Sequence, residues 1–196
     1  KITNCKIVGP MADSDRIPGI DVCYQDKDEF NFGNEIVSIM DVPGHTKGHI
    51  AFYFSKSQAL FCGDTLFTGG CGYLFDGPPA RMHDSLMRLA ALPGHTKVCC
   101  AHEYTQDNLR FAWVAEPENR ALASRIKQVW AKRSRGECVV PSTIAEERQT
   151  NPFLRTNSAA LQRRVKSALP GHPMGTDAEI FAATRAWKDA KPHRDL

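Results

Sequence analysis

Residues 42–49 read VPGHTKGH, and this stretch is the strongest indication of how the first half of the chain folds. It follows the apolar run 35–40, which is typical of a strand, and it places a Pro-Gly turn directly before His45. A turn at the end of a strand holds the next side chain at the edge of a sheet. A histidine after a turn is also common in solvent, so this stretch by itself leaves both interpretations open.

Two later motifs also place a polar residue directly after an apolar, strand-like run. Asp64 lies in a Gly-Asp-Thr triplet after the apolar run 59–62, and His102 lies in an Ala-His-Glu-Tyr quartet after the run 97–100. An isolated carboxylate in apolar surroundings is costly unless it is paired. We therefore expect His45, Asp64 and His102 to converge at one sheet edge, where imidazole and carboxylate suit zinc, iron or manganese.

Together the three motifs resemble those of the metallo-β-lactamase superfamily. With their flanking residues they resemble its hydroxyacylglutathione hydrolase, or glyoxalase II, branch. The resemblance covers essentially all 196 residues. It implies two divalent metal ions, zinc with iron or manganese as alternatives, held by His45, Asp64 and His102. In the family the aspartate bridges both ions and is essential for catalysis, so this role falls to Asp64. His49 would support the ligands without touching metal.

The first part of the family's pattern is missing from the sequence. Members open their metal site with a Thr-His-x-His-x-Asp-His segment, and nothing in the 196 residues matches it. The chain also begins at Lys1 rather than Met, inside a run that is typical of a strand. The expectation is a polypeptide that lacks an N-terminal portion and half of its metal ligands, and that is inactive on its own.

The resemblance also implies a surface that binds glutathione. Residues 69–77 read GGCGYLFDG and are similar to a family loop that holds the tripeptide, with Phe75 as an aromatic contact. Tyr73 stands where the family has a cation, and a neutral hydrogen bond is about half as strong as a charge-assisted one. Tyr104 matches a residue whose hydroxyl meets the tripeptide. Without the flanking phrases, the loop also fits a glycine-rich turn with buried aromatic rings.

Arg185 and Lys188 resemble the family's clamp for a substrate carboxylate. They are three apart on the last predicted helix, and are therefore expected to be neighbours on its surface. Paired cations are also typical of any solvated helix, so both interpretations stay open here.

The pattern of apolar residues divides the chain at about residue 103. Before it, short apolar runs predict strands at 5–8, 20–24, 35–42, 49–54, 59–62 and 97–101, with one helix at 79–91. The fold class expected is α/β: the remainder of a metallo-β-lactamase-type αββα sandwich over residues 1–103. Residues 104–196 are expected to form a small all-helical domain that binds glutathione.

The second half shows helical signals only. They predict a helix over 107–116, and another that starts with Pro117 at its first position and ends at Gly136. A third helix stops at Pro170-Gly171. A capping box of Thr176 and Glu179 opens the last one. Residues 150–155 are expected to form an extended link.

Composition excludes several classes of function. The formal net charge is +3, and the densest basic region, 127–135, is typical of a solvated helix face rather than a nucleic-acid footprint. No apolar run approaches the ~18 residues that a membrane span needs. Seven irregularly spaced cysteines indicate free thiols in a reducing cytoplasm. A monomer is expected for the intact protein.

Four further histidines are assigned outside the metal site. His95 repeats the Pro-Gly-His-Thr phrase but follows a predicted helix, so it is expected in a turn. The others are expected in solvent: His83, His172 and His193.

The activity that the resemblance implies is hydrolysis of S-D-lactoylglutathione to D-lactate and glutathione by a metal-bound hydroxide. Two alternatives remain. One is an iron-dependent persulfide dioxygenase of the same fold, and the other is an inactive fragment that binds glutathione weakly. The helical second half and the Arg185/Lys188 pair favour the thioesterase.

Overall fold

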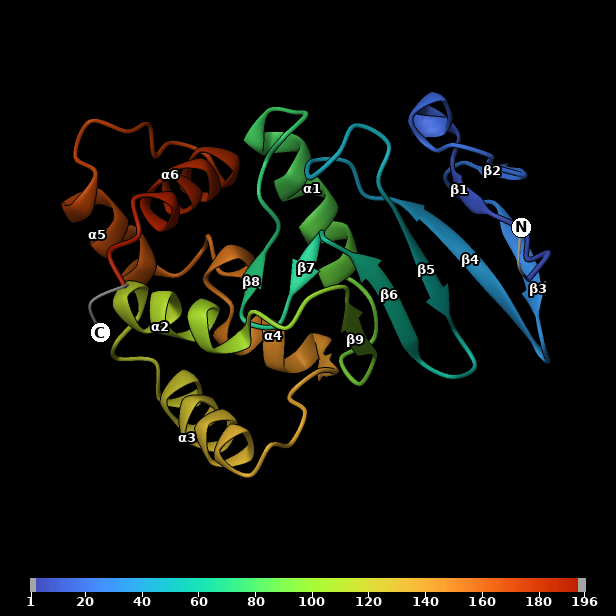
Figure 1. The fold of residues 1–196 in the computed structure, drawn as a ribbon. Coiled ribbons are helices and arrows are strands. Elements are labelled where there is room, and N and C mark those ends of the chain that lie inside the picture. Colours follow the sequence, from blue (N-terminus) through green and yellow to red (C-terminus); the bar gives the residue numbers. More distant parts are fainter. Residues whose placement is uncertain (1–2, 194–196) are drawn as a thin grey trace.

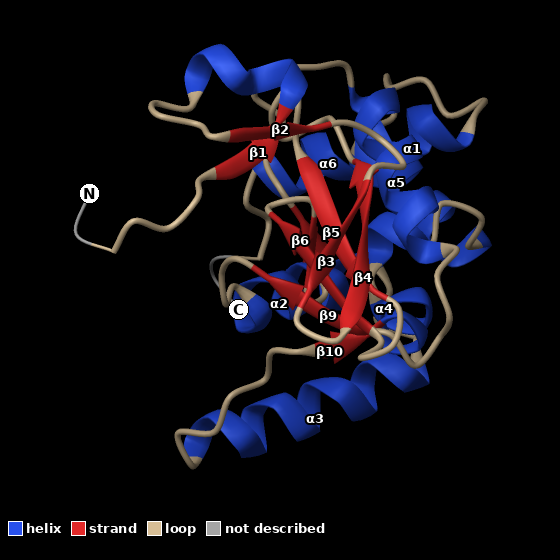
Figure 2. Ribbon diagram, turned by 90° about the vertical axis from the view of Figure 1, so that its right-hand side faces the viewer, coloured by secondary structure: helices blue, strands red, loops and turns tan. Residues whose placement is uncertain are grey.

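A six-stranded sheet forms one side of the molecule and helices cover one of its faces, in a computed structural model that describes residues 3–193 (Figures 1 and 2). The strand order across the sheet is β10-β9-β6-β5-β4-β3. Its strands are β3 (Glu29–Phe32), β4 (Glu35–Asp41), β5 (Ile50–Phe54), β6 (Ala59–Gly63), β9 (Lys97–Cys100) and β10 (Ser142–Thr143).

Strand direction decides where the candidate ligands lie. Strands β6 and β9 pair in parallel, whereas β4–β5 and β5–β6 pair antiparallel. Strands β4, β6 and β9 therefore run in one direction, and their C-terminal ends share one edge of the sheet. The crossover from β6 to β9 passes through helix α1 (Pro79–Ala90), as a parallel pair requires.

One face of the sheet packs against α1. Because side chains alternate along a strand, Leu60 and Val98 point to the same side, and both are fully buried. On the facing side of α1, Met82, Leu86 and Leu89 are also fully buried. Burial of each such side chain contributes roughly 1.5–3 kcal/mol, so this layer fixes the helix on the sheet.

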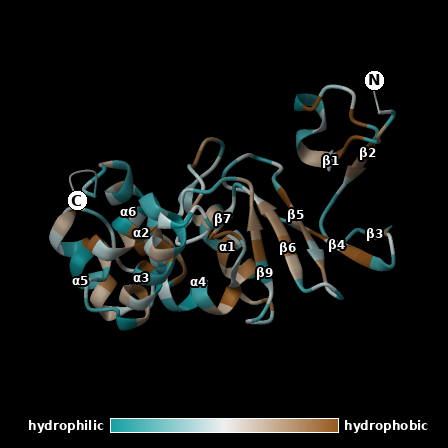
Figure 3. Ribbon diagram, turned by 60° about the horizontal axis from the view of Figure 1, so that its bottom comes forward, coloured by the Kyte–Doolittle hydropathy of each residue, from teal (hydrophilic) through white to brown (hydrophobic). Residues whose placement is uncertain are grey.

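The opposite face carries a cluster that we call the phenylalanine face. Strand register places five rings on it, and the rings contact one another across strands, for example Phe54 and Phe61 with centroids 5.3 Å apart. Phe61 is 47% exposed, and an open cavity of about 570 Å³ lies over this face. Figure 3 shows hydrophobic colour along these strands. The five are Phe30, Phe32, Phe52, Phe54 and Phe61.

The second half of the chain is helical. Figure 1 shows its helices gathered on the side of α1 away from the sheet. They are α2 (Thr105–Ala115), α3 (Arg120–Ser134), α4 (Ile144–Thr150), α5 (Ala159–Ala168) and α6 (Asp177–Asp189).

The two halves share one apolar core and one polar tie. The same buried cluster contains Leu60 of the sheet and Phe153 and Phe181 of the helical half. Strand β10, from the second half, pairs with β9 at the edge of the sheet. The sheet and helices therefore pack as a continuous body.

The polar tie is Glu147, which is fully buried on α4. Its carboxylate forms an ion pair with Arg125 of α3, and it accepts hydrogen bonds from Gly69 N (2.8 Å) and Asn151 Nδ2 (3.0 Å). A buried charge is tolerated only when paired and hydrogen-bonded. This residue therefore joins the backbone at Gly69 to α3 and α4.

Most expected elements are present, with shifts at their ends. The strand expected at 5–8 is wrong: β1 is Val8–Pro10, and it pairs in parallel with β2 (Val22–Tyr24). A 3₁₀ helix, Met11–Arg16, separates them. Helix α3 starts at Arg120 because Asn119 caps it through Leu122 N, so Pro117 is not its first residue.

Sequence patterns missed several short elements. Strand β3 carries only two apolar residues, and β7 (Leu66–Phe67) and β8 (Gly70–Cys71) are two residues long. Helix α4 is mostly polar and was not expected. The link at 150–155 is a 3₁₀ turn, Pro152–Leu154, rather than extended chain. The capping box of Thr176 and Glu179 is confirmed.

Two histidines expected in solvent are buried. His83 is 7% exposed beside the ring of Phe181, with centroids 5.7 Å apart, and His193 is 3% exposed with Nε2 3.2 Å from Asp107 Oδ1. Helix periodicity put His83 on α1 but could not show that α6 covers it. All seven cysteines are free thiols, and among the described helices none is long and apolar enough to cross a membrane.

Candidate metal centre

Three predicted ligands meet at the shared edge of β4, β6 and β9. His45 Nε2 lies 3.3 Å from Asp64 Oδ2, and His102 Nε2 lies 3.4 Å from Asp64 Oδ1. Each imidazole thus faces a different oxygen of one carboxylate. The convergence expected from the three strand ends is present, whereas the role of these residues as ligands stays a prediction.

The carboxylate of Asp64 is incompletely satisfied by protein. Its Oδ1 atom is shielded from solvent, and the nearby His102 ring makes no hydrogen bond to it. A shielded carboxylate oxygen without a donor is costly, and a cation beside it removes that cost. The donor set fits a carboxylate shared between two cations, with one imidazole for each.

Each half of this arrangement is short of donors. Within residues 3–193 no group of three or more His, Cys, Asp or Glu side chains surrounds a single point closely enough to hold a metal ion. This agrees with the geometry, because the two histidines lie on opposite oxygens. Catalytic zinc usually has three protein ligands, so each half would need further donors.

The backbone of the loop 69–77 sets the orientation of His45. His45 Nδ1 lies 2.8 Å from the carbonyl oxygen of Tyr73. A carbonyl oxygen only accepts hydrogen bonds, so Nδ1 carries the proton and Nε2 presents its lone pair to the Asp64 side. This is the usual way in which a partner outside the metal site fixes the tautomer of a ligand.

His49 fixes Asp64 rather than facing the centre. The backbone N–H of Asp64 donates to His49 Nε2 at 3.1 Å. Burial lowers the pKa of His49, and the neighbouring His45 lowers it further, which favours the neutral ring that this hydrogen bond requires. Gly63 has φ of +52°, and a Cβ there would overlap His49 Nε2.

Gly72 lets the loop lie directly on the site. A Cβ at this position would overlap the carbonyl oxygen of Asp64 and lie 3.2 Å from His45 Nδ1. The Gly72 N–H donates to Thr65 O at 3.1 Å, which holds the two segments together. Only a residue without a side chain permits this approach.

Exposed aromatic rings surround the metal edge. Tyr73, Phe75 and Tyr104 are 54%, 66% and 52% exposed. Phe75 lies against His45 with ring centroids 5.1 Å apart, and Tyr104 stacks on His102 at 5.1 Å. The rings form an apolar rim on which part of a substrate can rest.

Further contacts to the turn after His45 were not expected from the sequence. Asp13 is buried and accepts a hydrogen bond from Gly48 N at 2.8 Å. Arg16 forms an ion pair with Asp76, which also accepts from Lys47 N at 3.2 Å. These contacts join residues 29 to 60 positions apart, so no local pattern could have indicated them.

Arg185 and Lys188 are neighbours on α6, as expected from their spacing, and they are buried rather than solvated. They are 7% and 8% exposed. Arg185 donates to Cys71 O at 3.2 Å and pairs with Asp189 at 2.6 Å, and its guanidinium lies 5.2 Å over the Phe153 ring. Residue spacing showed that the cations are neighbours but not that their shared face points inward.

Lys188 is held by amide and carboxylate groups of α2. Its ammonium donates to Asn108 Oδ1, and Asp107 Oδ2 lies 4.0 Å away. Burial lowers its pKa to about 8, and the adjacent Arg185 contributes in the same direction. The pair lies next to the loop 69–77 but is engaged with protein groups.

A known protein family matches each half of the chain. The Metallo-beta-lactamase superfamily matches residues 7–102, and the family described as Hydroxyacylglutathione hydrolase C-terminus matches residues 103–191. A protein of Methylococcus capsulatus named hydroxyacylglutathione hydrolase is 52% identical over 187 residues. The chain belongs to the hydroxyacylglutathione hydrolase family. That match covers 95% of this chain and 71% of the relative.

Other relatives support the same family. The hydroxyacylglutathione hydrolases of Pseudomonas fluorescens and Gloeobacter violaceus are 48% and 51% identical, over 95% and 93% of this chain and 71% and 70% of their own lengths. The chain thus spans about seven tenths of these family members.

Solved structures share the fold. ETHE1 from Myxococcus xanthus matches with a TM-score of 0.56 and 22% identity over 96% of this chain and 67% of its own. A protein crystallised in a di-iron-bound form matches with a TM-score of 0.53 and 23% identity, over 78% of this chain and 67% of its own. At these identities the likeness shows a metallo-β-lactamase fold, and membership of this superfamily implies divalent metal binding.

Proposed function

We propose that the chain carries the catalytic centre of a thioesterase that converts S-D-lactoylglutathione to D-lactate and glutathione. The relatives at 44–52% identity bear the name hydroxyacylglutathione hydrolase. The observation that carries the proposal is the pair of imidazoles facing separate oxygens of Asp64. No serine or cysteine nucleophile is needed at such a site.

His45 with Asp64 would hold one divalent ion, and His102 with Asp64 would hold the other, zinc in both positions. Ions bound there lower the pKa of a water molecule toward ~7 and polarise the thioester carbonyl. The Tyr73 carbonyl keeps His45 in the tautomer with a free Nε2, and His49 holds the Asp64 backbone. The donors still missing would come from a His-x-His-x-Asp-His segment, which these 196 residues do not contain.

The substrate side of the proposal uses the aromatic rim and α6. Tyr73, Phe75 and Tyr104 would contact the tripeptide beside the metal edge. Arg185 and Lys188 would reach its carboxylate by exchanging a present protein contact for the substrate, and Arg185 also supports the loop through Cys71 O.

The domains that we propose are a metal-binding domain at 1–103 and a helical domain at 104–196 that binds glutathione. The small-molecule thioester would be the partner of a monomeric enzyme. A reducing cytoplasm is the compartment that we propose, supported by seven free cysteines.

The test compares two polypeptides, each loaded with zinc: the 196-residue chain, and the same chain joined to a segment with the His-x-His-x-Asp-His motif. We expect release of glutathione from S-D-lactoylglutathione by the longer polypeptide alone, with two metal ions bound. Full turnover by the shorter chain would show that the missing donors lie elsewhere. One iron per molecule, with oxygen consumed on glutathione persulfide, would favour the dioxygenase instead.

A further inference from the structure

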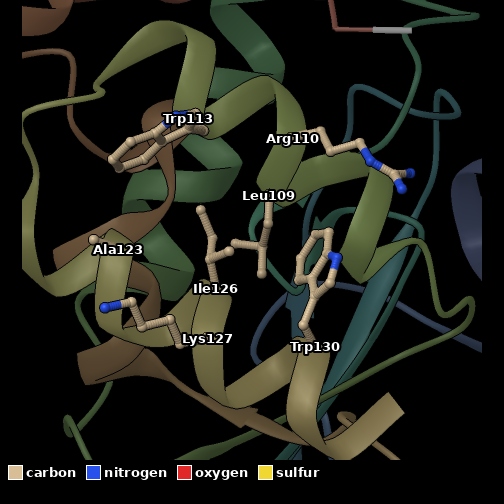
Figure 4. Close-up of a pocket in the computed structure, with 7 residues that line it drawn as sticks. All are labelled: Leu109, Arg110, Trp113, Ala123, Ile126, Lys127 and Trp130. Carbon is tan, nitrogen blue, oxygen red and sulfur yellow. The ribbon is translucent and has the colours of Figure 1, made fainter. Parts of the chain in front are cut away.

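A trough between α2 and α3 lies outside the metal centre and is not used by the proposed reaction. It has a volume of about 410 Å³, which is within the range of small-molecule sites. Figure 4 shows Leu109 and Ile126 in its centre, with the indole rings of Trp113 and Trp130 on either side. Trp113 is 38% exposed, so part of its indole ring faces solvent here.

The charges around the trough are all positive. Arg110 and Lys127 line it, and no acidic residue does. In Figure 4 their charged ends point to opposite sides of the trough. Helix α3 contains five cations and no carboxylate.

Two of the other α3 cations are already compensated, whereas the trough cations are not. Arg125 pairs with Glu147, and Arg133 with Glu103. No salt bridge in the described part of the chain involves Arg110 or Lys127. An apolar trough with uncompensated cations complements a ligand that is both apolar and anionic.

Of the two cations, Arg110 is better placed to bind a carboxylate. Its guanidinium lies 5.6 Å from the centre of the Trp130 ring, a cation–π distance that restrains the side chain at the edge of the apolar surface. A guanidinium also binds a carboxylate through two parallel hydrogen bonds, which an ammonium does not.

We propose that this trough binds an anionic amphiphile, a medium-chain carboxylate, with its alkyl chain between Trp113 and Trp130 and its carboxylate on Arg110. The aliphatic centre, Leu109 and Ile126, fits an alkyl chain better than a flat base. Binding there is independent of metal, because the trough shares no residue with the metal centre.

The test is a titration of the metal-free chain with decanoate below its micellar concentration, followed by tryptophan fluorescence and calorimetry. Two of the three tryptophans line the trough, and Trp187 is buried, so the fluorescence signal reports mainly on the trough. We expect saturable binding of one decanoate. Decyltrimethylammonium, with the same chain and the opposite charge, and butyrate, with a short chain, should not bind.

Four variants separate the contributions. Arg110→Gln should weaken decanoate binding about tenfold, the effect of losing one charge-assisted hydrogen bond. Trp113→Ala should weaken it similarly, and Lys127→Gln less. Lys166→Gln, the same charge change on the exposed side of α5, is the matched control and should bind normally. All four positions are at least partly exposed, and thermal unfolding confirms that each variant folds.

Four results would overturn the proposal. Equal binding of the cationic amphiphile, or normal binding by Arg110→Gln, would remove the role of charge. Displacement of decanoate by an oligonucleotide would make this face a nucleic-acid surface. Dimerisation of the free chain that Trp113→Ala abolishes would mean that a second copy covers the trough.

Discussion

Asp64 and Glu147 are two carboxylates of this chain with opposite environments. Glu147 is fully buried and receives an ion pair and two hydrogen bonds, from Arg125, Gly69 and Asn151. Asp64 is partly exposed, and its Oδ1 atom has no donor although two imidazoles lie nearby. The two carboxylates lie close to the same stretch of backbone, because Glu147 accepts a hydrogen bond from Gly69 N and Gly69 is five residues after Asp64.

The difference separates a structural charge from one that is available to a ligand. Glu147 is compensated within the fold, so its removal leaves Arg125 unpaired. Asp64 is compensated only when cations arrive, so its removal costs the fold little and the function much. The predictions below follow from this contrast.

Glu147→Gln should have the largest effect on stability. It leaves the buried Arg125 without its counter-ion, which typically costs ~3–5 kcal/mol. Urea denaturation of the chain measures the change. Glu146→Gln, one residue earlier and in an exposed capping box, should cost ~1 kcal/mol or less. Similar costs for the two substitutions would contradict the structural role of Glu147.

Asp64→Asn should change the metal centre rather than the fold. In metal-free chain we expect the free energy of unfolding to stay within about 0.5 kcal/mol, as for a surface substitution. In the polypeptide that includes the His-x-His-x-Asp-His segment, metal affinity should fall by more than the ~100-fold typical of a residue outside the ligand set. Turnover should be lost. Two tightly held ions and a near-normal rate would disprove the bridging role.

Arg185→Gln should raise KM for the thioester about ten- to hundredfold and lower kcat less, because a grip remote from the reacting bond contributes equally to ground and transition states. Arg163→Gln, an exposed cation on α5, serves as the control. If kcat collapses while KM stays constant, Arg185 acts on the metal centre through Cys71 and not on substrate.

Tyr73→Arg tests the position where the family has a cation. The new guanidinium should strengthen glutathione binding several-fold, within the ~1 kcal/mol typical of an exposed ion pair. Tyr73 is 54% exposed, so the longer side chain fits without repacking, and its backbone carbonyl stays available to His45. Calorimetric titration with glutathione measures the change, and unaltered binding would mean that the loop contacts substrate differently.

Lys188 should contribute a dependence of stability on pH. Its pKa is lowered to about 8 from 10.5, so between these values the unfolded chain binds more protons than the folded chain. The contribution of Lys188 to stability therefore rises with pH across this window, by at most ~1.4 kcal/mol per pH unit, and is constant below it. Lys188→Met should remove this slope, and denaturation curves of both proteins across the window test it.

Local patterns were sufficient for some features and could not be for others. Strand ends and turns brought His45, Asp64 and His102 together correctly, because each follows an apolar run at the point where a strand ends. The same reasoning wrongly expected His83 in solvent and left the burial of Arg185 and Lys188 undecided, because burial depends on which face of a helix meets a distant partner. The Asp13–Gly48 and Arg16–Asp76 ties likewise depend on tertiary contacts with no sequence signature.

Gly63 and Gly72 imply a particular result for saturation mutagenesis of this edge. Neither residue has a side chain that could bind metal, yet a Cβ at either would overlap the His49 ring or the Asp64 backbone. Alanine should therefore be as harmful at these two positions as at a ligand, whereas at the exposed Tyr73 and Phe75 the fold should accept many residues and only substrate binding should change. In a map of tolerated substitutions, the two glycines would then be as intolerant of change as the histidines of the site.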